Sequence, residues 1–158
     1  MAKTLACSIV ASRFDYCNAL LYIAPVAIIN KLQRAQNNLA RMVCQFRGRS
    51  DARPLLHSLQ WLPMRQRIEY KVALITYKVL KTSNPLYLAD LLEIQVASRA
   101  VRSSYAPHLV LLLTWTELVK RAFAVAAPVI WKSLPAHLRH CQTVLTFKKH
   151  LKTQYFND

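Results

Sequence analysis

The side chains that could do acid–base or metal chemistry are few in this chain of 158 residues, and they are scattered. Its seven acidic residues are dispersed, and only Asp90 and Glu93 are spaced to share one face of a helix. Two-metal phosphoryl transfer needs clustered carboxylates to hold both ions, and a pair three residues apart is more typical of a solvated helix face. The acids therefore predict no metal-dependent active site.

His137, His140 and Cys141 form the one cluster of metal-ligand type in the sequence. A structural zinc site needs four ligands, usually as two pairs, and the sequence offers no second pair. We therefore expect exposed or capping histidines. The four cysteines lie far apart without a C-x-x-C motif, which favours reduced, largely buried thiols. We predict no catalytic residue, no metal site and no cofactor, so that the chain is not an enzyme by itself.

The strongest chemical signal is the charge. The chain has 22 Lys and Arg against 7 Asp and Glu, a formal net charge of +15. A field of this size attracts phosphate backbones or anionic membrane surfaces. So few compensating acids favour contact with a polyanion over simple solvation.

The basic residues recur on helix-spaced stripes with aromatic residues between them. Basic groups and aromatic rings together can hold single-stranded nucleic acid by charge and stacking. Aromatic residues at helical spacing more often fill the core, and we expect that role for most of them. The predicted nucleic-acid-binding residues are Lys31, Arg34, Arg41, Arg47, Arg49, Arg67, Lys71, Lys78, Lys148, Lys149 and Lys152.

Two strong helices are expected to carry most of these cations. Apolar residues recur at alternating steps of four and three over residues 25–46, and Pro25 suits a helix start. A second helical pattern follows Pro63 and ends at Asn84-Pro85. Shorter helices are predicted over residues 54–59 and 86–93, and a terminal helix over 143–155.

Glycine is scarce, since Gly48 is the only one in the sequence. Glycine supplies the positive-φ positions of tight turns and of most helix C-termini. Its scarcity argues against a β-rich fold with many hairpins and excludes every glycine-rich phosphate loop.

The region after residue 94 is harder to assign. Residues 109–115 form a continuous apolar run whose short length favours a strand, and residues 117–131 look helical until Pro128 kinks or ends the helix. We predict a mostly α fold: an irregular bundle of about six helices, with one short β-strand pair near residues 105–116. Residues 1–93 would form one helical part, 94–117 an irregular linker or short strands, and 118–158 a C-terminal helical part, together one compact unit.

Four ordered blocks of sequence resemble a known family. They are SRFDYCNALLY with KLQRAQNNLARMV (12–22, 31–43), LQWLPMRQRIEYKVALITYKVL (59–80), NPLYLADLL with SRAVRSS (84–92, 98–104), and KRAFAVAAPVIWKSLPAHLR with FKKHLKT (120–139, 147–153). In this order they resemble the region downstream of the polymerase palm in LINE-type (non-LTR) retrotransposon reverse transcriptases of the Jockey-like group. The resemblance spans nearly the whole chain.

This resemblance implies the thumb and following helical region of an RNA-directed DNA polymerase, with residues 1–93 as the thumb-like part. The parent's catalytic aspartates lie in a Y-x-D-D-type palm motif that no position here matches. The implied partners are the backbone of RNA or an RNA–DNA hybrid and the missing palm, in the nucleus or cytoplasm, with no membrane partner. A glycine common after Leu-Tyr in the family is Ile23 here, and a Pro-Arg-Thr-Arg-like stretch is replaced by residues 112–115.

Two other interpretations stay open. An orphan or decayed helical remnant, separated from its palm, would expose apolar surface and act as a protein–protein interaction module. Basic amphipathic helices also suit a membrane surface, although the cations are spread over several elements.

Overall fold

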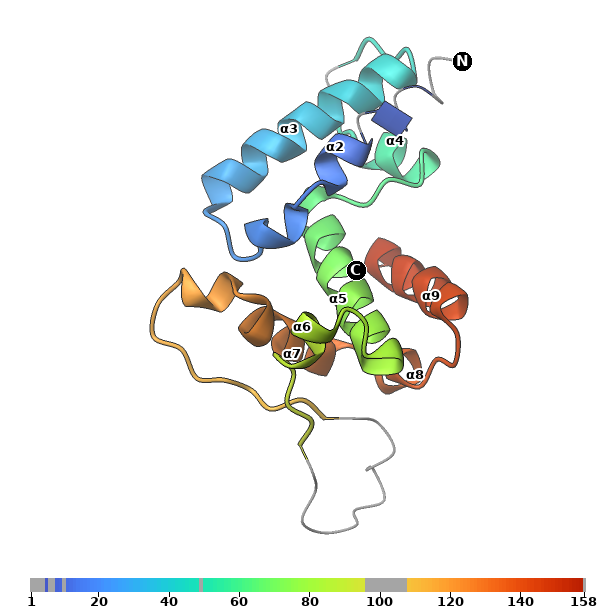
Figure 1. The fold of residues 1–158 in the computed structure, drawn as a ribbon. Helices are drawn as coiled ribbons and strands as arrows, with labels where there is room; N and C mark the ends of the chain where they lie inside the picture. Colours follow the sequence, from blue (N-terminus) through green and yellow to red (C-terminus); the bar gives the residue numbers. More distant parts are fainter. Residues whose placement is uncertain (1–4, 6–7, 10, 49, 96–107, 158) are drawn as a thin grey trace.

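The computed structural model describes residues 5, 8–9, 11–48, 50–95 and 108–157, and this part of the chain is mostly helical, as predicted (Figure 1). The N-terminal segment forms a short helix, α2 (Ala11–Asp15), and a 3-10 helix, η2 (Asn18–Leu21). Both pack against the central helix, α5 (Met64–Thr82).

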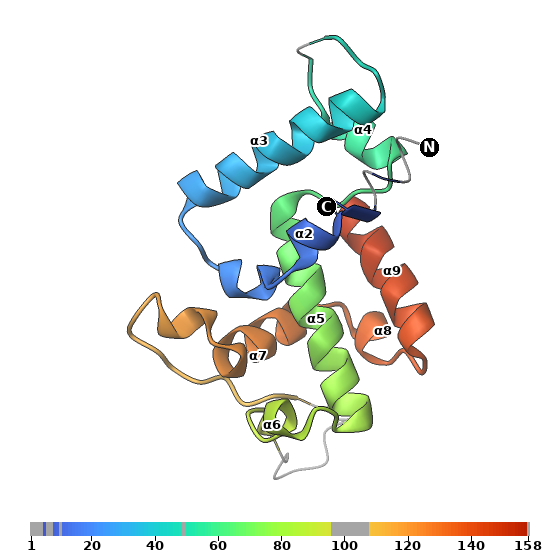
Figure 2. The same cartoon turned by 45° about the horizontal axis from the view of Figure 1, so that its top comes forward.

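The longest N-terminal helix, α3 (Val26–Val43), lies beside α4 (Arg53–Ser58) at one end of the molecule (Figures 1 and 2). Pro25 precedes the first residue of α3, as predicted. A small apolar core of Ala40, Leu56 and Trp61 holds the two helices together.

The larger core surrounds α5, which packs against α7 (Phe123–Ser133) and α9 (Val144–Asn157). Three aromatic rings meet there. Tyr77 stacks on Phe147 with ring centroids 4.2 Å apart, and Trp131 lies 6.2 Å from Phe147. The Tyr77 hydroxyl donates a hydrogen bond to the carbonyl of Cys141 at 2.8 Å. These contacts confirm that most aromatic residues at helical spacing fill the core.

A polar joint connects α3 to the start of α5. Gln36 is fully buried and donates from Nε2 to the carbonyl of Leu62 at 2.9 Å. Gln33 donates to Oε1 of Gln36 and accepts the backbone N–H of Met64 at 2.8 Å. Because Met64 is the first residue of α5, Gln33 satisfies a backbone donor that the helix itself cannot.

Turns in this glycine-poor chain use other residues in the left-handed region. Ser83 ends α5 at φ 50°, and its N–H bonds to the carbonyl of Val79 at 2.8 Å. Ile23, between η2 and α3, has φ 54°. Gly48 does not serve this purpose, since it does not have a positive φ.

The predictions for residues 86–131 need correction. The helix predicted over 86–93 is only α6 (Leu86–Ala89), so Asp90 and Glu93 lie beyond its end. The helix predicted over 117–131 is a 3-10 turn, η3 (Val119–Arg121), followed by α7, because Ala122 is extended. Nor does Pro128 end that helix: α7 continues to Ser133, with Pro128 itself buried in the packing.

The strand pair predicted near residues 105–116 is wrong for residues 108–116. Leu109 forms one isolated antiparallel bridge with Ile94, and no strand follows it in the described part. Strand-forming side chains make a strand only where a neighbouring strand supplies hydrogen bonds, and no backbone hydrogen bond joins residues 111–115 to another described residue. Residues 105–107 lie outside the described residues.

The last helices agree with the sequence. Pro135 precedes a short turn, α8 (Ala136–Arg139), and α9 covers the predicted terminal helix. None of the helices in the described ranges has both the length and the apolar character needed to cross a membrane.

Candidate nucleic-acid interface

Three acids are already committed to ion pairs within the molecule. In the described ranges these join Arg53 to Asp51 at 2.5 Å, Arg67 to Asp15 at 2.6 Å and Lys120 to Glu117 at 2.5 Å. The basic residues elsewhere differ in whether they bond within the molecule or are open to a ligand.

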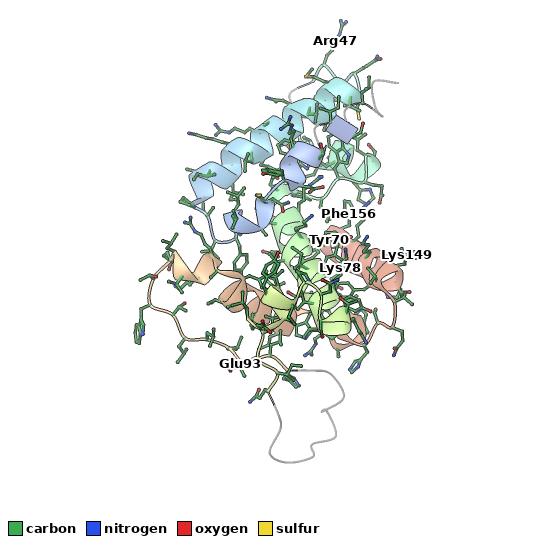
Figure 3. The ribbon with its side chains drawn as sticks, viewed as in Figure 1. Arg47, Tyr70, Lys78, Glu93, Lys149 and Phe156 are labelled. Atoms are coloured by element: carbon green, nitrogen blue, oxygen red, sulfur yellow. The ribbon has the colours of Figure 1, made fainter. Side chains whose placement is uncertain are left out.

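The first group of predicted cations lies on and just after α3. Lys31 and Arg34 are exposed, because the buried residues Gln36 and Ala40 place the opposite side of the helix inward. Arg47, also exposed, follows α3 and lies at the far end of the molecule from α9 (Figure 3). Arg49 lies outside the described residues. Lys31, Arg34 and Arg47 are therefore exposed to solvent at this end of the molecule.

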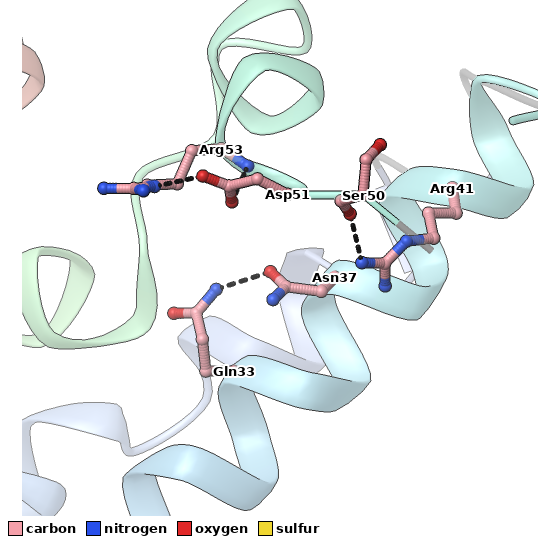
Figure 4. Close-up of polar contacts among 6 residues, drawn as sticks. All are labelled: Gln33, Asn37, Arg41, Ser50, Asp51 and Arg53. Carbon is pink, nitrogen blue, oxygen red and sulfur yellow. Dashed lines mark hydrogen bonds and ion pairs between the residues drawn. The ribbon is translucent and has the colours of Figure 1, made fainter. Parts of the chain in front are cut away.

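Arg41, in contrast, is held by its own chain. Its Nη2 donates to the carbonyl of Ser50 at 2.9 Å, and its Nη1 donates to Oδ1 of Asn38 at 3.3 Å (Figure 4). The nearby Arg53 bonds Asp51 through both its backbone N–H and its side chain, which holds the pKa of Asp51 below its usual value. Arg41 therefore closes the loop after α3.

The second group lies on α5. Arg67 forms two hydrogen bonds with the Asp15 carboxylate, at 2.6 and 2.9 Å, and its side chain is only 13% exposed. This pair ties α2 to α5. Lys71 is half-buried and Lys78 is exposed. Of the three predicted α5 cations, Lys78 is the most open to a ligand.

The third group lies on α9, where Lys149 is exposed and Lys148 and Lys152 are half-buried (Figure 3). Lys152 Nζ lies 5.8 Å from the centroid of the Phe156 ring, a cation–π distance. Burial, and then the charge of Arg67, lower the pKa of Lys152.

One hollow brings predicted cations from two helices together. It measures about 210 Å³ and is lined by Arg67, Lys152, Asp15 and the rings of Trp61 and Tyr70, among others. Burial, and then the charge of Asp15, raise the pKa of Tyr70. The hollow offers net positive charge beside aromatic surface, the combination expected of a nucleic-acid contact.

The sequence did not predict a second basic hollow. It measures about 370 Å³, and His108, Lys132 and Arg139 line it with no acid among its described lining residues. Arg139 Nε is buried and has no hydrogen-bond partner among the residues that the structure describes. Lys132 lies on α7 and Arg139 lies on α8, with Pro135 between the two helices, so no single helical period relates these residues. Tertiary structure alone brings His108 to them.

The residues considered for metal or nucleophile chemistry stay apart. His137 and His140 are exposed, as expected, and no group of three His, Cys, Asp or Glu in the described ranges could hold a metal ion. Cys141 is buried, with its Sγ 3.8 Å from Nδ1 of His150. Cys17 is exposed, so the expectation of buried thiols is wrong there.

Comparison of the chain with protein families, curated proteins and solved structures finds no match in any of the three.

Proposed function

We propose that this chain holds the backbone of RNA or of an RNA–DNA hybrid through cations on α3, α5 and α9, and that it does no chemistry of its own. The observation that carries the proposal is that predicted cations on three helices are exposed and form no ion pair within the described part of the chain: Lys31 and Arg34 on α3, Lys78 on α5, and Lys149 on α9. A phosphate backbone supplies the counter-charge that the protein lacks around them.

Within this proposal the predicted cations have two roles. Those with exposed side chains contact phosphates. Arg41 and Arg67 instead bond within the chain, and they hold in place the elements on which the exposed cations lie. Lys152 and Tyr70 would meet a sugar or base edge at the hollow between α5 and α9.

The family resemblance supports the same proposal. In a LINE-type reverse transcriptase the corresponding region would be a non-catalytic C-terminal part that grips the template–primer, with the parent's palm as protein partner. The locations that suit this role are the nucleus and the cytoplasm.

The test is binding to an RNA–DNA hybrid measured over a salt series. A protein that makes six to ten phosphate contacts loses about 10³ to 10⁵ in affinity between 50 and 200 mM salt. The informative variant is Lys31→Gln/Arg34→Gln, which removes two unpaired cations from α3. Each lost phosphate contact should lower the salt slope by about one, so the double variant should lower it by about two.

The matched control is Arg53→Gln/Lys120→Gln. It removes the same formal charge, but from cations already paired with Asp51 and Glu117. We expect its salt slope to stay near that of the parent chain. Affinity that does not change with salt, or equal loss in both double variants, would contradict a specific α3 contact.

A further inference from the structure

Two basic hollows share one arginine at the corner where α8 follows α7. Arg139 and Trp131 line both of them. The larger is the hollow of about 370 Å³ described above, which Lys132 also lines. The smaller measures about 160 Å³ and reaches the last turn of α5, where Lys81 and His140 also line it. None of the exposed cations proposed to contact nucleic acid lines either hollow, so this corner is separate from the function proposed above.

The charge of this corner is not balanced by acids of the described chain. Neither hollow has an Asp or Glu among its described lining residues, and Glu93, beside the bridge, lines neither. Arg139, Lys132 and Lys81 take part in none of the ion pairs of the described ranges. Residues 96–107, which lie outside the described part, contain two arginines and no acid in their sequence. That segment therefore has no carboxylate to offer, whatever its path.

The guanidinium of Arg139 has donors to spare at the wall of both hollows. Its Nε is buried and has no acceptor among the described residues. Arg41 and Arg121 also have a buried Nε of this kind, but neither side chain lines either hollow. A buried donor without an acceptor costs free energy, and the cost is larger for a charged group. A guanidinium presents its N–H groups as a planar fork that matches two oxygens of a phosphate.

We propose that the larger hollow binds a phosphate monoester, with Arg139 donating to two phosphate oxygens and Lys132 balancing the remaining charge. A phosphate monoester carries close to two negative charges at neutral pH, which two cations neutralise. The rest of the lining includes Leu109, Leu111 and Trp131, an apolar wall that suits the organic group of the ester. The volume of the hollow lies within the usual range for small-molecule sites, about 300–1,000 Å³. The ester is either a free molecule or the terminal phosphate of a nucleic-acid strand.

The test is titration of the full chain, freed of nucleic acid, while the NMR signals of the arginine Nε–H groups are recorded. The Arg139 signal is the one that is missing in Arg139→Lys. We expect inorganic phosphate and AMP each to shift this signal to saturation, whereas adenosine should leave it unchanged. Acetate should bind at least about tenfold more weakly than phosphate, because it carries a single charge. No shift at Arg139, or equal affinity for acetate and phosphate, overturns the proposal.

A pair of short RNA strands, one with a terminal phosphate and one with a terminal hydroxyl, separates the two sources of the ester. A shift of the Arg139 signal with the phosphorylated strand alone supports the proposal and identifies a strand end as ligand. No shift with either strand, beside saturation by AMP, supports the proposal and identifies a free monoester. An equal shift with both strands overturns it, because internal phosphates would then suffice.

The residues themselves are tested by calorimetry of AMP binding. Lys132→Gln/Arg139→Gln should weaken binding by roughly tenfold to a hundredfold, because it removes charge-assisted hydrogen bonds. The control, Arg53→Gln/Lys120→Gln, removes the same formal charge from side chains that line neither hollow, and should leave AMP binding unchanged. Equal loss in both double variants, or in neither, overturns the assignment.

Stability is a separate matter for Lys132, which lies in the last turn of α7, where a cation offsets the helix dipole without any ligand. Lys132→Gln alone, at an exposed side chain, therefore gives a folded variant in which AMP binding should still be weaker than in the parent chain. On an RNA–DNA hybrid with hydroxyl ends, Lys132→Gln/Arg139→Gln should keep the salt slope of the parent. This proposal and the nucleic-acid contact of α3 can therefore fail independently.

Discussion

Five residues other than glycine have left-handed backbone conformations in the described part of the chain: Cys17, Ile23, Gln45, Gln60 and Ser83. A left-handed φ costs an L-residue roughly 1–2 kcal/mol, and for a β-branched residue it is a clear outlier. Ile23 is therefore the most strained of the five. Gly48, which could adopt this conformation freely, instead lets the Phe46 ring approach, since a Cβ there would lie 2.6 Å from Phe46 Cε1.

Replacing Ile23 with glycine should stabilise the protein. Glycine adopts φ 54° without strain but costs about 0.5–1 kcal/mol in chain entropy, so we expect Ile23→Gly to raise the free energy of unfolding by about 0.5–1 kcal/mol. Urea unfolding measures this change. Ile28→Gly is the control, because Ile28 is exposed to the same extent, 43% against 44%, but lies within α3. That variant should be less stable than the parent, and a loss of stability in both would contradict strain at Ile23.

Single-residue features were only partly predictable. The resemblance predicts a glycine at the position of Ile23, and Ile23 has a positive φ of 54°. The ion pair between Arg67 and Asp15 was not predictable, because it joins residues 52 positions apart. Nothing in the spacing of the α5 cations distinguished the paired Arg67 from the open Lys78.

The elements with a clear apolar period were predicted best. Helices α3 and α5 lie within one to three residues of their expected bounds, because each has a regular apolar face and a proline just before its first residue. The apolar run at residues 109–115 has no such face. Its sequence favours a strand, but only a pairing partner can make one.

The junction of α5, α9 and the turn before α9 depends on the Tyr77 hydroxyl. Tyr77→Phe would leave the buried Cys141 carbonyl without its donor, which should lower the free energy of unfolding by about 1–2 kcal/mol at pH 8. Tyr87→Phe, at an exposed residue of α6, should cost nothing measurable. An equal loss in both variants would contradict a role for this hydrogen bond.

The same substitution predicts a pH effect. Burial, and then the nearby Cys141, raise the pKa of Tyr77. The unfolded chain therefore releases the phenolic proton first as pH rises above about 10, so the stability that Tyr77 contributes declines there. The difference in unfolding free energy between the parent chain and Tyr77→Phe should shrink between pH 8 and about 10.5. A difference that grows over this range would contradict the direction of the pKa shift.

At the scale of the whole molecule, two cores of unequal size meet at a polar joint. The small core of α3 and α4 contains Ala40, Leu56 and Trp61, whereas the large core surrounds α5. The buried Gln36 connects α3 to the segment before α5. Periodicity located both helices but gave no sign that a glutamine, rather than an apolar residue, would join them. The predicted cations lie on separate surfaces because α3 belongs to the small core, whereas α5 and α9 belong to the large core. The sequence of a single helix does not show this grouping.

Hydrogen exchange should resolve the two cores. We expect the α3 amides to open at a lower free energy than those of α5, because fewer buried apolar contacts hold α3. Gln36→Leu leaves the Leu62 carbonyl without its donor and should lower the opening free energy of α3 by about 1–3 kcal/mol, without affecting α9. Asn30→Leu, at an exposed residue of α3, is the control. A uniform change over both cores would show one cooperative unit instead.

The glutamine joint also bears on how the chain folds as it is made. Gln33 leaves the ribosome 31 residues ahead of Met64, the residue whose N–H it accepts. Until that segment emerges, the joint-forming side of α3 presents amide groups that water satisfies, where a leucine pair would present surface for a chaperone or another nascent chain to capture. The polar joint therefore exposes less apolar surface on the nascent chain than a leucine pair would.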